Sequence, residues 1–237
     1  NREELLDAVN FNTKAISLVN PNNPTGKILS KEEMNAVVSI AQKFDAWLLA
    51  DEVYSGAERH NVDATQSFFG LYEKVIIVNG LSKAYGLPGL RIGWVVAPKN
   101  IINELWKRHE YTTVSSSMLG NRLANLALMP DVKRALTART RDLVDSGFEI
   151  LQTYLNEVPG VFSVVPPMAS ALSFTSYNLP INSTELVHKL RREKGILLVP
   201  GDCFGLDGYL RISSALPREY LQDGLSRLNE VVRELAH

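Results

Sequence analysis

The chain has 237 residues, 45% of them hydrophobic and 22% charged, which excludes disordered and fibrous classes and allows one large domain or a domain with a smaller partner. Twenty-five basic and 26 acidic side chains give a formal net charge of −1, so no bulk field favours nucleic acid or an anionic membrane as a partner. The single cysteine, Cys203, permits no internal disulfide and fits a reducing, cytoplasmic compartment.

The first part of the chain alternates between short apolar runs and a helix-period stretch. A helix is predicted from about Ser30 to Phe44, because Ser30 and Glu33 have capping-box spacing and apolar residues recur on one face. The predicted strands are residues 15–19, 46–50, 75–78 and 92–96. This alternation predicts an α/β fold of three layers with a mainly parallel sheet, whose ligand sites lie in loops beyond the carboxyl ends of the strands.

The pattern from Asn100 to about Val158 is helical, and Pro130 separates a helix over 115–129 from a longer helix that begins near Asp131. After Pro159 the predicted elements are shorter and form a smaller α+β C-terminal domain. Its strands are expected at residues 161–165, 171–175, 196–199 and 209–213, and its helices at 184–193 and 218–235. We place the domain boundary inside the long helix, which gives domains of residues 1–145 and 146–237.

Lys83 is the first candidate for chemistry, because it follows the β-branched run 75–78 inside the glycine-rich segment SKAYGLPGLRIG. We expect a lysine at the end of a buried strand to be poorly solvated. Burial favours the neutral amine, and a neutral amine can form an imine with a carbonyl compound. Taken alone, Lys83 is also consistent with a surface lysine, and Arg91 in the same segment with a cation at a strand edge.

Three other loops or strands carry polar residues that a sheet core does not favour. NPNNPTG at residues 20–26 contains Asn23, DEVY at 51–54 contains Asp51 and Tyr54, and the strand YLRIS contains Arg211. Each has an ordinary structural explanation: a rigid turn, a helix cap and an exposed or ion-paired strand arginine. Their occurrence together with the lysine segment is far more specific than any one of them.

In this combination and order, the four segments resemble class I/II aminotransferases, which are pyridoxal-phosphate enzymes of fold type I. The resemblance covers essentially the whole chain and implies part of the large domain of that fold, followed by the small domain. It also implies pyridoxal 5′-phosphate as cofactor, and an amino acid and a 2-oxo acid as substrates. The cofactor supplies the electron sink, while the protein supplies binding, orientation and electrostatics.

The resemblance assigns roles residue by residue. Lys83 would hold the cofactor as a Schiff base and move a proton at the substrate α-carbon. Asp51 would keep the ring nitrogen protonated, and Tyr54 and Asn23 would donate hydrogen bonds to the 3′-oxygen. The remaining roles are phosphate binding by Arg91 and Ser82, although Gly80 stands where many relatives have a serine, and binding of the substrate carboxylate by Arg211 and Asn23.

The resemblance also implies an upstream segment, because the family's large domain normally begins well before Asn1. That segment would hold early strands, part of the phosphate site and a ring-stacking aromatic. We therefore expect the isolated 237 residues to bind the cofactor weakly or not at all and to be inactive. The whole protein is expected to be a homodimer, without a nucleic-acid or membrane partner, and four scattered histidines predict no metal site.

Two other functions remain open. A lyase or cyclising enzyme could use the same lysine and cofactor for elimination, because fold and motifs do not fix the reaction outcome. A ligand-sensing domain of a transcription regulator could borrow the fold, and an upstream helix-turn-helix would identify it. The segment Glu110–Ser117 contains no arginine, which disfavours a substrate with a second carboxylate.

Overall fold

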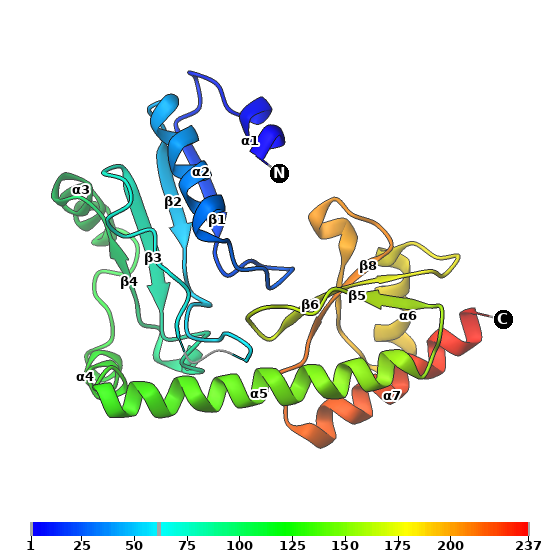
Figure 1. The fold of residues 1–237 in the computed structure, drawn as a ribbon. Coiled ribbons are helices and arrows are strands. Elements are labelled where there is room, and N and C mark those ends of the chain that lie inside the picture. Colours follow the sequence, from blue (N-terminus) through cyan, green and yellow to red (C-terminus); the bar gives the residue numbers. More distant parts are fainter. Residues whose placement is uncertain (1, 61–62, 237) are drawn as a thin grey trace.

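The computed structural model describes residues 2–60 and 63–236, which form two sheets joined by one long helix (Figure 1). The first part contains α1 (Arg2–Ala8), β1 (Ala15–Val19), α2 (Lys31–Lys43), β2 (Trp47–Asp51), β3 (Val75–Gly80), η1 (Pro88–Leu90), β4 (Gly93–Val96), α3 (Lys99–His109) and α4 (Met118–Ala127). The second part contains α5 (Pro130–Asn156), β5 (Phe162–Val164), β6 (Leu172–Tyr177), α6 (Ser183–Lys194), β7 (Val199–Pro200), η2 (Gly201–Phe204), β8 (Tyr209–Ser213) and α7 (Arg218–Leu235).

The first sheet has the strand order β1-β2-β3-β4 and confirms the predicted α/β class. Strands β1, β2 and β3 are parallel, and β4 runs antiparallel to β3. The register pairs Val19 with Asp51, and Asp51 with Val78. The carboxyl ends of three neighbouring strands therefore lie at one level, and the loops that follow them emerge at the same edge of the sheet.

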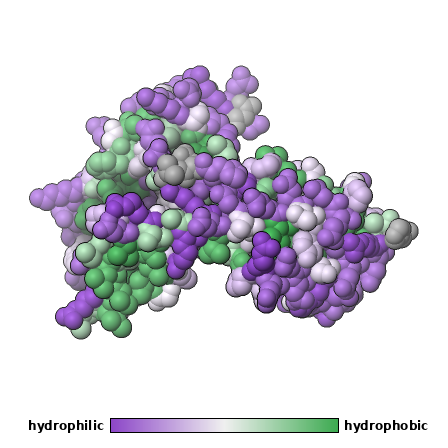
Figure 2. Space-filling view, turned by 60° about the horizontal axis from the view of Figure 1, so that its bottom comes forward, coloured by the Kyte–Doolittle hydropathy of each residue, from purple (hydrophilic) through white to green (hydrophobic). Residues whose placement is uncertain are grey.

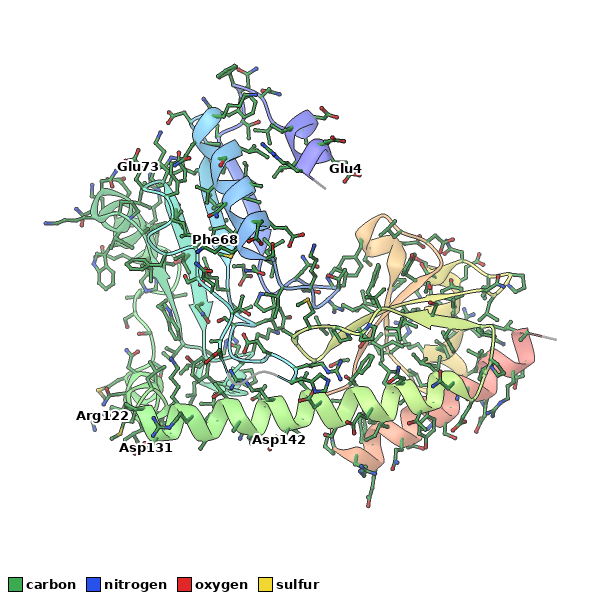
Figure 3. The ribbon with its side chains drawn as sticks, viewed as in Figure 1. Glu4, Phe68, Glu73, Arg122, Asp131 and Asp142 are labelled. Atoms are coloured by element: carbon green, nitrogen blue, oxygen red, sulfur yellow. The ribbon has the colours of Figure 1, made fainter. Side chains whose placement is uncertain are left out.

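Helix α2 covers this sheet and confirms the capping box. The Ser30 hydroxyl accepts from the Glu33 backbone N–H, and the Glu33 carboxylate accepts from the Ser30 N–H. The buried face of the helix packs onto strand residues such as Leu48, together with the fully buried Phe68, which Figure 3 shows against the sheet. The helix thereby closes one face of the sheet without covering its carboxyl edge.

The second sheet is antiparallel throughout, in the order β5-β6-β8-β7. Its core side packs on the second half of α5 and on α7. Helix α5 runs along both sheets, with Asp131 near α4 at one end and Asp142 near its middle (Figure 3). Buried residues from Phe148 onward belong to the core of the second sheet. The boundary near residue 145 stays a prediction.

Four elements differ from the sequence-based expectation. Residues 196–198 are not a strand, because Gly195 ends α6 with a left-handed φ of 65° and the chain reaches the sheet only at Val199. The helix predicted over 115–129 is shorter, since the Ser117 hydroxyl caps it and sets its start at Met118. Helix α1 was not predicted, and the strand expected over 92–96 begins at Gly93.

The exposed large apolar side chains are concentrated between Val95 and Val132. They include Trp106 of α3, which is 65% exposed, and Leu119 of α4, which is 66% exposed. Figure 2 shows a broad hydrophobic area on one part of the surface. A cluster of exposed apolar side chains is typical of a face that another polypeptide covers. Within the described residues, no helix is both long and apolar enough to cross a bilayer.

Candidate active site

The NPNNPTG loop leaves the carboxyl end of β1 and is held by its own polar side chains. The side-chain oxygen of Asn22 accepts a hydrogen bond from the Thr25 hydroxyl at 2.8 Å, and its backbone oxygen accepts one from the Gly26 N–H at 2.9 Å. The Leu29 N–H donates to the side chain of Asn20 at 2.9 Å. This bonding fixes the loop and leaves the half-buried Asn23 at its tip.

Asn23 contacts Arg211 of the second sheet. Arg211 Nη1 donates to Asn23 Oδ1 at 3.1 Å, which joins two residues 188 positions apart in the sequence. The Arg211 guanidinium also lies 5.6 Å from the centre of the Phe204 ring. Residues of β8 alternate between the core and the open face of the sheet, and Arg211 is on the open face. A cation is thus presented at the edge where the first sheet's loops emerge.

Asp51 and Tyr54 follow β2 at the same edge. Asp51 Oδ1 accepts from the Val53 N–H at 3.1 Å, which holds the carboxylate beside the strand end. Tyr54 is buried, and this burial raises the pKa of its hydroxyl; Arg211 lowers that pKa and Asp51 raises it. The hydroxyl therefore stays protonated at neutral pH and can donate to an anionic oxygen.

Lys83 is exposed, which contradicts the expectation that it would be buried at the strand end. The reason lies in the turn that follows β3. Leu81 and Ala84 are fully buried and direct the segment into the core, so the lysine between them faces outward. Lys83 lines a cleft of about 500 Å³ together with Tyr54, Ser82 and Arg139. The amine is therefore accessible to a ligand.

Backbone hydrogen bonds and α5 shape the turn around Lys83. The Gly86 N–H donates to the Lys83 oxygen and the Leu87 N–H to the Leu81 oxygen, both at 2.9 Å. Gly86 has a left-handed φ of 63°, and a Cβ there would lie 2.6 Å from Arg139 Nη2. Arg139 Nη2 also donates to the Tyr85 oxygen at 3.0 Å. The left-handed φ therefore favours a glycine where the helix closes on the turn.

Arg91 lies at the end of η1 with a left-handed φ of 54°, exposed, and its Nη1 donates to the Pro88 oxygen at 3.2 Å. Ser82 is half-buried and lines the cleft with Lys83. Among the residues that the structure describes, the cleft lining does not include Asn23, Asp51, Arg91 or Arg211. The structure thus brings Asn23 and Arg211 into contact and places Tyr54, Ser82 and Lys83 on one cleft, while Asp51 and Arg91 belong to neither group.

The donor set is suited to pyridoxal phosphate. A carboxylate, Asp51, suits a protonated ring nitrogen, and the hydroxyl of Tyr54 and the amide of Asn23 suit the ring's 3′-oxygen. Lys83 offers an exposed amine for the aldehyde, and the planar fork of Arg91 suits phosphate oxygens. In the part of the chain described, no three His, Cys, Asp or Glu side chains are grouped as metal ligands.

Two buried glutamates after β2 were missed by sequence reasoning. Glu52 Oε1 accepts from the Ser67 hydroxyl and the Phe68 N–H, and burial raises the pKa of its carboxyl. Glu58 is 1% exposed and accepts from Gly56, from Thr65 and from Arg141 Nη2 at 3.0 Å. In the sequence both are indistinguishable from surface acids. Arg141, the partner of Glu58, is one of several cations on α5, so it gives no distinguishing signal in the sequence.

Replacing Glu58 with glutamine is expected to lower the free energy of unfolding at pH 7 by about 3 kcal/mol, because it breaks a buried ion pair. Burial alone would raise the pKa of Glu58, but hydrogen bonds from Gly56 and Thr65 outweigh it, so the pKa lies below its usual value. Glu58 therefore stabilises the fold above its unfolded pKa, roughly 4.3, and this contribution is lost as the pH falls further. Denaturant unfolding from pH 3 to pH 8 should show the difference between wild type and variant shrinking in acid.

Glu73 is the matched control for this measurement, because it is exposed before β3 (Figure 3). Glu73→Gln should change the free energy of unfolding by less than about 0.5 kcal/mol at pH 7. A Glu58→Gln variant as stable as this control would contradict the assignment of Glu58 as a structural ion-pair partner.

Comparisons with known proteins identify the family of the chain. An aspartate aminotransferase of Streptomyces avermitilis is 32% identical over 246 residues, covering 98% of this chain and 59% of the relative. A probable N-acetyl-LL-diaminopimelate aminotransferase of Bacillus subtilis is 30% identical, covering 94% of this chain and 56% of the relative. The solved structure of a PLP-dependent aminotransferase from Streptococcus suis superposes with a TM-score of 0.90 at 33% identity, covering 99% of this chain and 61% of that one.

The chain thus spans 56% to 61% of the lengths of these three relatives. The likeness extends over both sheets, since each alignment covers nearly all of this chain. The sequence profile of the family described as "Aminotransferase class I and II" matches residues 2–228. The chain belongs to the class I and II aminotransferase family.

Proposed function

We propose that the whole protein carrying this sequence is a pyridoxal-phosphate-dependent aminotransferase that transfers an amino group from an amino acid to a 2-oxo acid. The observation that carries the proposal is the convergence at the carboxyl edge of the first sheet. There the Arg211–Asn23 hydrogen bond of 3.1 Å joins the two sheets, and the buried Tyr54, which interacts with the charge of Arg211, lines one cleft with the accessible Lys83. Family membership supports the same reaction class.

When bound, pyridoxal phosphate would supply the electron sink that makes the α-proton of an amino acid removable. Lys83 Nζ would hold the cofactor covalently and then, once displaced by the substrate amine, take the proton from the α-carbon. Asp51 would hold a proton on the ring nitrogen, because a nearby carboxylate favours the charged ring. Tyr54 and Asn23 would donate to the 3′-oxygen, and Arg91 and Ser82 would bind the phosphate.

Arg211 would bind the α-carboxylate of the substrate through its planar fork. In the structure one N–H group of this guanidinium donates to the amide oxygen of Asn23, and the guanidinium lies near the face of the Phe204 ring. A carboxylate that approaches Arg211 would therefore meet the residue that also faces the cofactor's 3′-oxygen. A carboxylate bound there would orient the substrate amine toward Lys83, whose proton transfer depends on correct placement.

We also propose a cytoplasmic homodimer. The exposed apolar side chains between Val95 and Val132 support a protein partner on this face, and further chain of the same protein could cover part of it. No binding of nucleic acid is proposed, because the net charge of −1 offers no attraction for it. The α-amino and 2-oxo acid substrates remain to be identified by turnover.

A panel of amino donors and 2-oxo acids on the whole protein tests the proposal. Product should form only when a donor and a 2-oxo acid are both present. The panel should include dicarboxylic substrates, whose binding is disfavoured because the segment Glu110–Ser117 contains no arginine. Ammonia released without any 2-oxo acid would instead favour the lyase or cyclising enzyme. Ligand binding without turnover would favour the sensor domain.

A further inference from the structure

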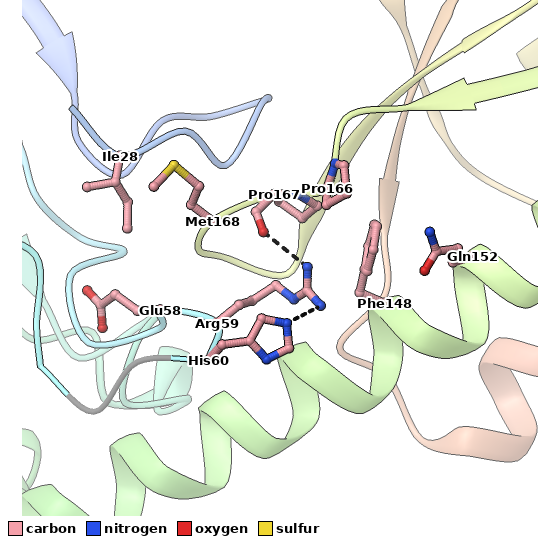
Figure 4. Close-up of a pocket in the computed structure, with 9 residues that line it drawn as sticks. All are labelled: Ile28, Glu58, Arg59, His60, Phe148, Gln152, Pro166, Pro167 and Met168. Atoms are coloured by element: carbon pink, nitrogen blue, oxygen red, sulfur yellow. Dashed lines mark hydrogen bonds between the residues drawn. The ribbon is translucent and has the colours of Figure 1, made fainter. Parts of the chain in front are cut away.

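Arg59 ties together three segments that are distant in the sequence (Figure 4). Its side chain is 7% exposed although it comes from a loop. Arg59 Nε donates to Asp145 Oδ1 of α5 at 3.0 Å, and Nη1 donates to the Pro167 oxygen at 3.2 Å. The guanidinium carbon lies 4.3 Å from the centre of the Phe148 ring. A buried guanidinium with a carboxylate, a carbonyl and an aromatic face is a stable, directional contact.

His60 completes the surroundings of this guanidinium. Arg59 Nη2 lies 3.0 Å from His60 Nε2, and because a guanidinium can only donate, Nε2 is the acceptor. The ring proton then lies on Nδ1, which is 3.5 Å from Asp145 Oδ1. All three side-chain nitrogens of Arg59 thus have a partner, which holds the side chain in this orientation.

The segment that Arg59 holds, residues 166–170, is also bonded to the first sheet's loops. The Arg59 N–H donates to the Met168 oxygen and the Ser170 N–H to the Ala57 oxygen, both at 2.8 Å. The Met168 and Ala169 N–H groups both donate to the Gly26 oxygen at 3.0 Å. Gly26 is the last residue of the NPNNPTG loop. The segment is therefore held between the loop of Arg59 and the loop of Asn23.

The same segment leads directly into β6, whose Phe174 is the register partner of Arg211. Arg211 returns to the NPNNPTG loop through Asn23. We propose that Arg59 is a positioning residue: by holding residues 166–170 against Gly26, it sets the place of β6 and β8 so that Arg211 lies opposite Asn23. The catalytic consequence rests on the function proposed above, whereas the contact itself does not.

Hydrogen exchange in the whole protein tests the contact without any turnover. The substitution Arg59→Lys keeps the positive charge but removes the planar guanidinium and most of its stacking on the Phe148 ring. In Arg59→Lys, the amides of Met168, Ala169 and Ser170 should exchange at least about tenfold faster, because local opening of the segment becomes easier. Arg134→Lys, at an exposed site of α5, is the control and should leave these amides unchanged. Unchanged exchange in Arg59→Lys would overturn the proposal.

Kinetics test whether the contact acts through Arg211. The best amino acid donor of the panel is compared with the amine that lacks its carboxylate, since Arg211 acts only on the carboxylate. Arg59→Lys should lower kcat/KM for the amino acid by about tenfold to a hundredfold. The kcat/KM for the amine should stay within about twofold of the wild-type value. Asp145→Asn should act in the same direction.

An equal loss for both substrates, or no loss for either, would show that Arg59 has only a structural role and would overturn the positioning role. If the whole protein has no turnover with any donor, the proposed function fails. The exchange result then still decides whether Arg59 holds residues 166–170.

Discussion

Replacing Lys83 with alanine in the whole protein is expected to abolish covalent attachment of pyridoxal phosphate and to lower turnover by at least about 10³-fold. Covalent attachment requires the amine, and proton transfer by a positioned base alone contributes roughly 10² to 10⁴. Borohydride reduction followed by peptide mass spectrometry should place the cofactor mass on the peptide that contains Lys83. Single-turnover kinetics, started with the amino donor already joined to the cofactor as an imine, then measure the proton-transfer step separately from covalent attachment to the lysine.

Lys133→Ala is the matched control for Lys83→Ala, because Lys133 is an exposed lysine of α5 on the same chain. The control should keep both attachment and turnover within about twofold of wild type, as is usual for a surface substitution. Reduction that labels another lysine, or a Lys83→Ala variant that turns over at the wild-type rate, would refute the assignment of Lys83.

The backbone architecture was largely predictable because local signals determine it. Ser30 and Glu33 form the predicted capping box, and the predicted bounds of the strand 209–213 and the helix 218–235 agree with β8 and α7. In each case, caps, periodicity and β-branched composition lie within a few residues of each other. The α/β class follows from the same alternation. Such information is carried by short stretches of sequence and does not depend on distant contacts.

The candidate site was predictable in its residue types but not in its surroundings. Asn23 and Arg211 are 188 positions apart, and nothing in either segment alone predicts their hydrogen bond. The exposure of Lys83 depends on which neighbours in the turn are buried, and here Leu81 and Ala84 take that role. The burial of Glu58 and Arg59 depends on α5, which begins only at Pro130. These properties arise from tertiary packing, which overrides local propensity.

Gly147 and Gly224 show the same limit and provide a sharp test of the fold. Both are glycines inside helices, α5 and α7, and sequence reasoning treats them alike: alanine should stabilise either helix by about 1 kcal/mol. In the structure, a Cβ at Gly147 would lie 2.1 Å from the Ser214 backbone oxygen, whereas a Cβ at Gly224 would meet nothing within 4 Å. The two substitutions should therefore have opposite signs.

Gly147→Ala is expected to lower the free energy of unfolding by about 3 kcal/mol, since overpacking exceeds the gain in helix propensity. Ser214 cannot move away cheaply, because its N–H donates to the Ala171 oxygen at 2.8 Å and the residue is 2% exposed. Gly224→Ala should raise the free energy of unfolding by up to about 1 kcal/mol. Denaturant unfolding of both variants at matched protein concentration measures the difference, and the slopes with denaturant should agree.

Equal stabilisation by the two alanines would mean that α5 and the end of β8 do not approach each other as closely as the structure shows. The consequence would reach the candidate site, because Ser214 directly follows the strand that carries Arg211. A partly destabilised Gly147→Ala variant should therefore also bind a substrate carboxylate less well. Gly224→Ala, whose new Cβ would meet nothing within 4 Å, should gain stability without any change in substrate binding. Only a close contact between α5 and Ser214 gives both results together.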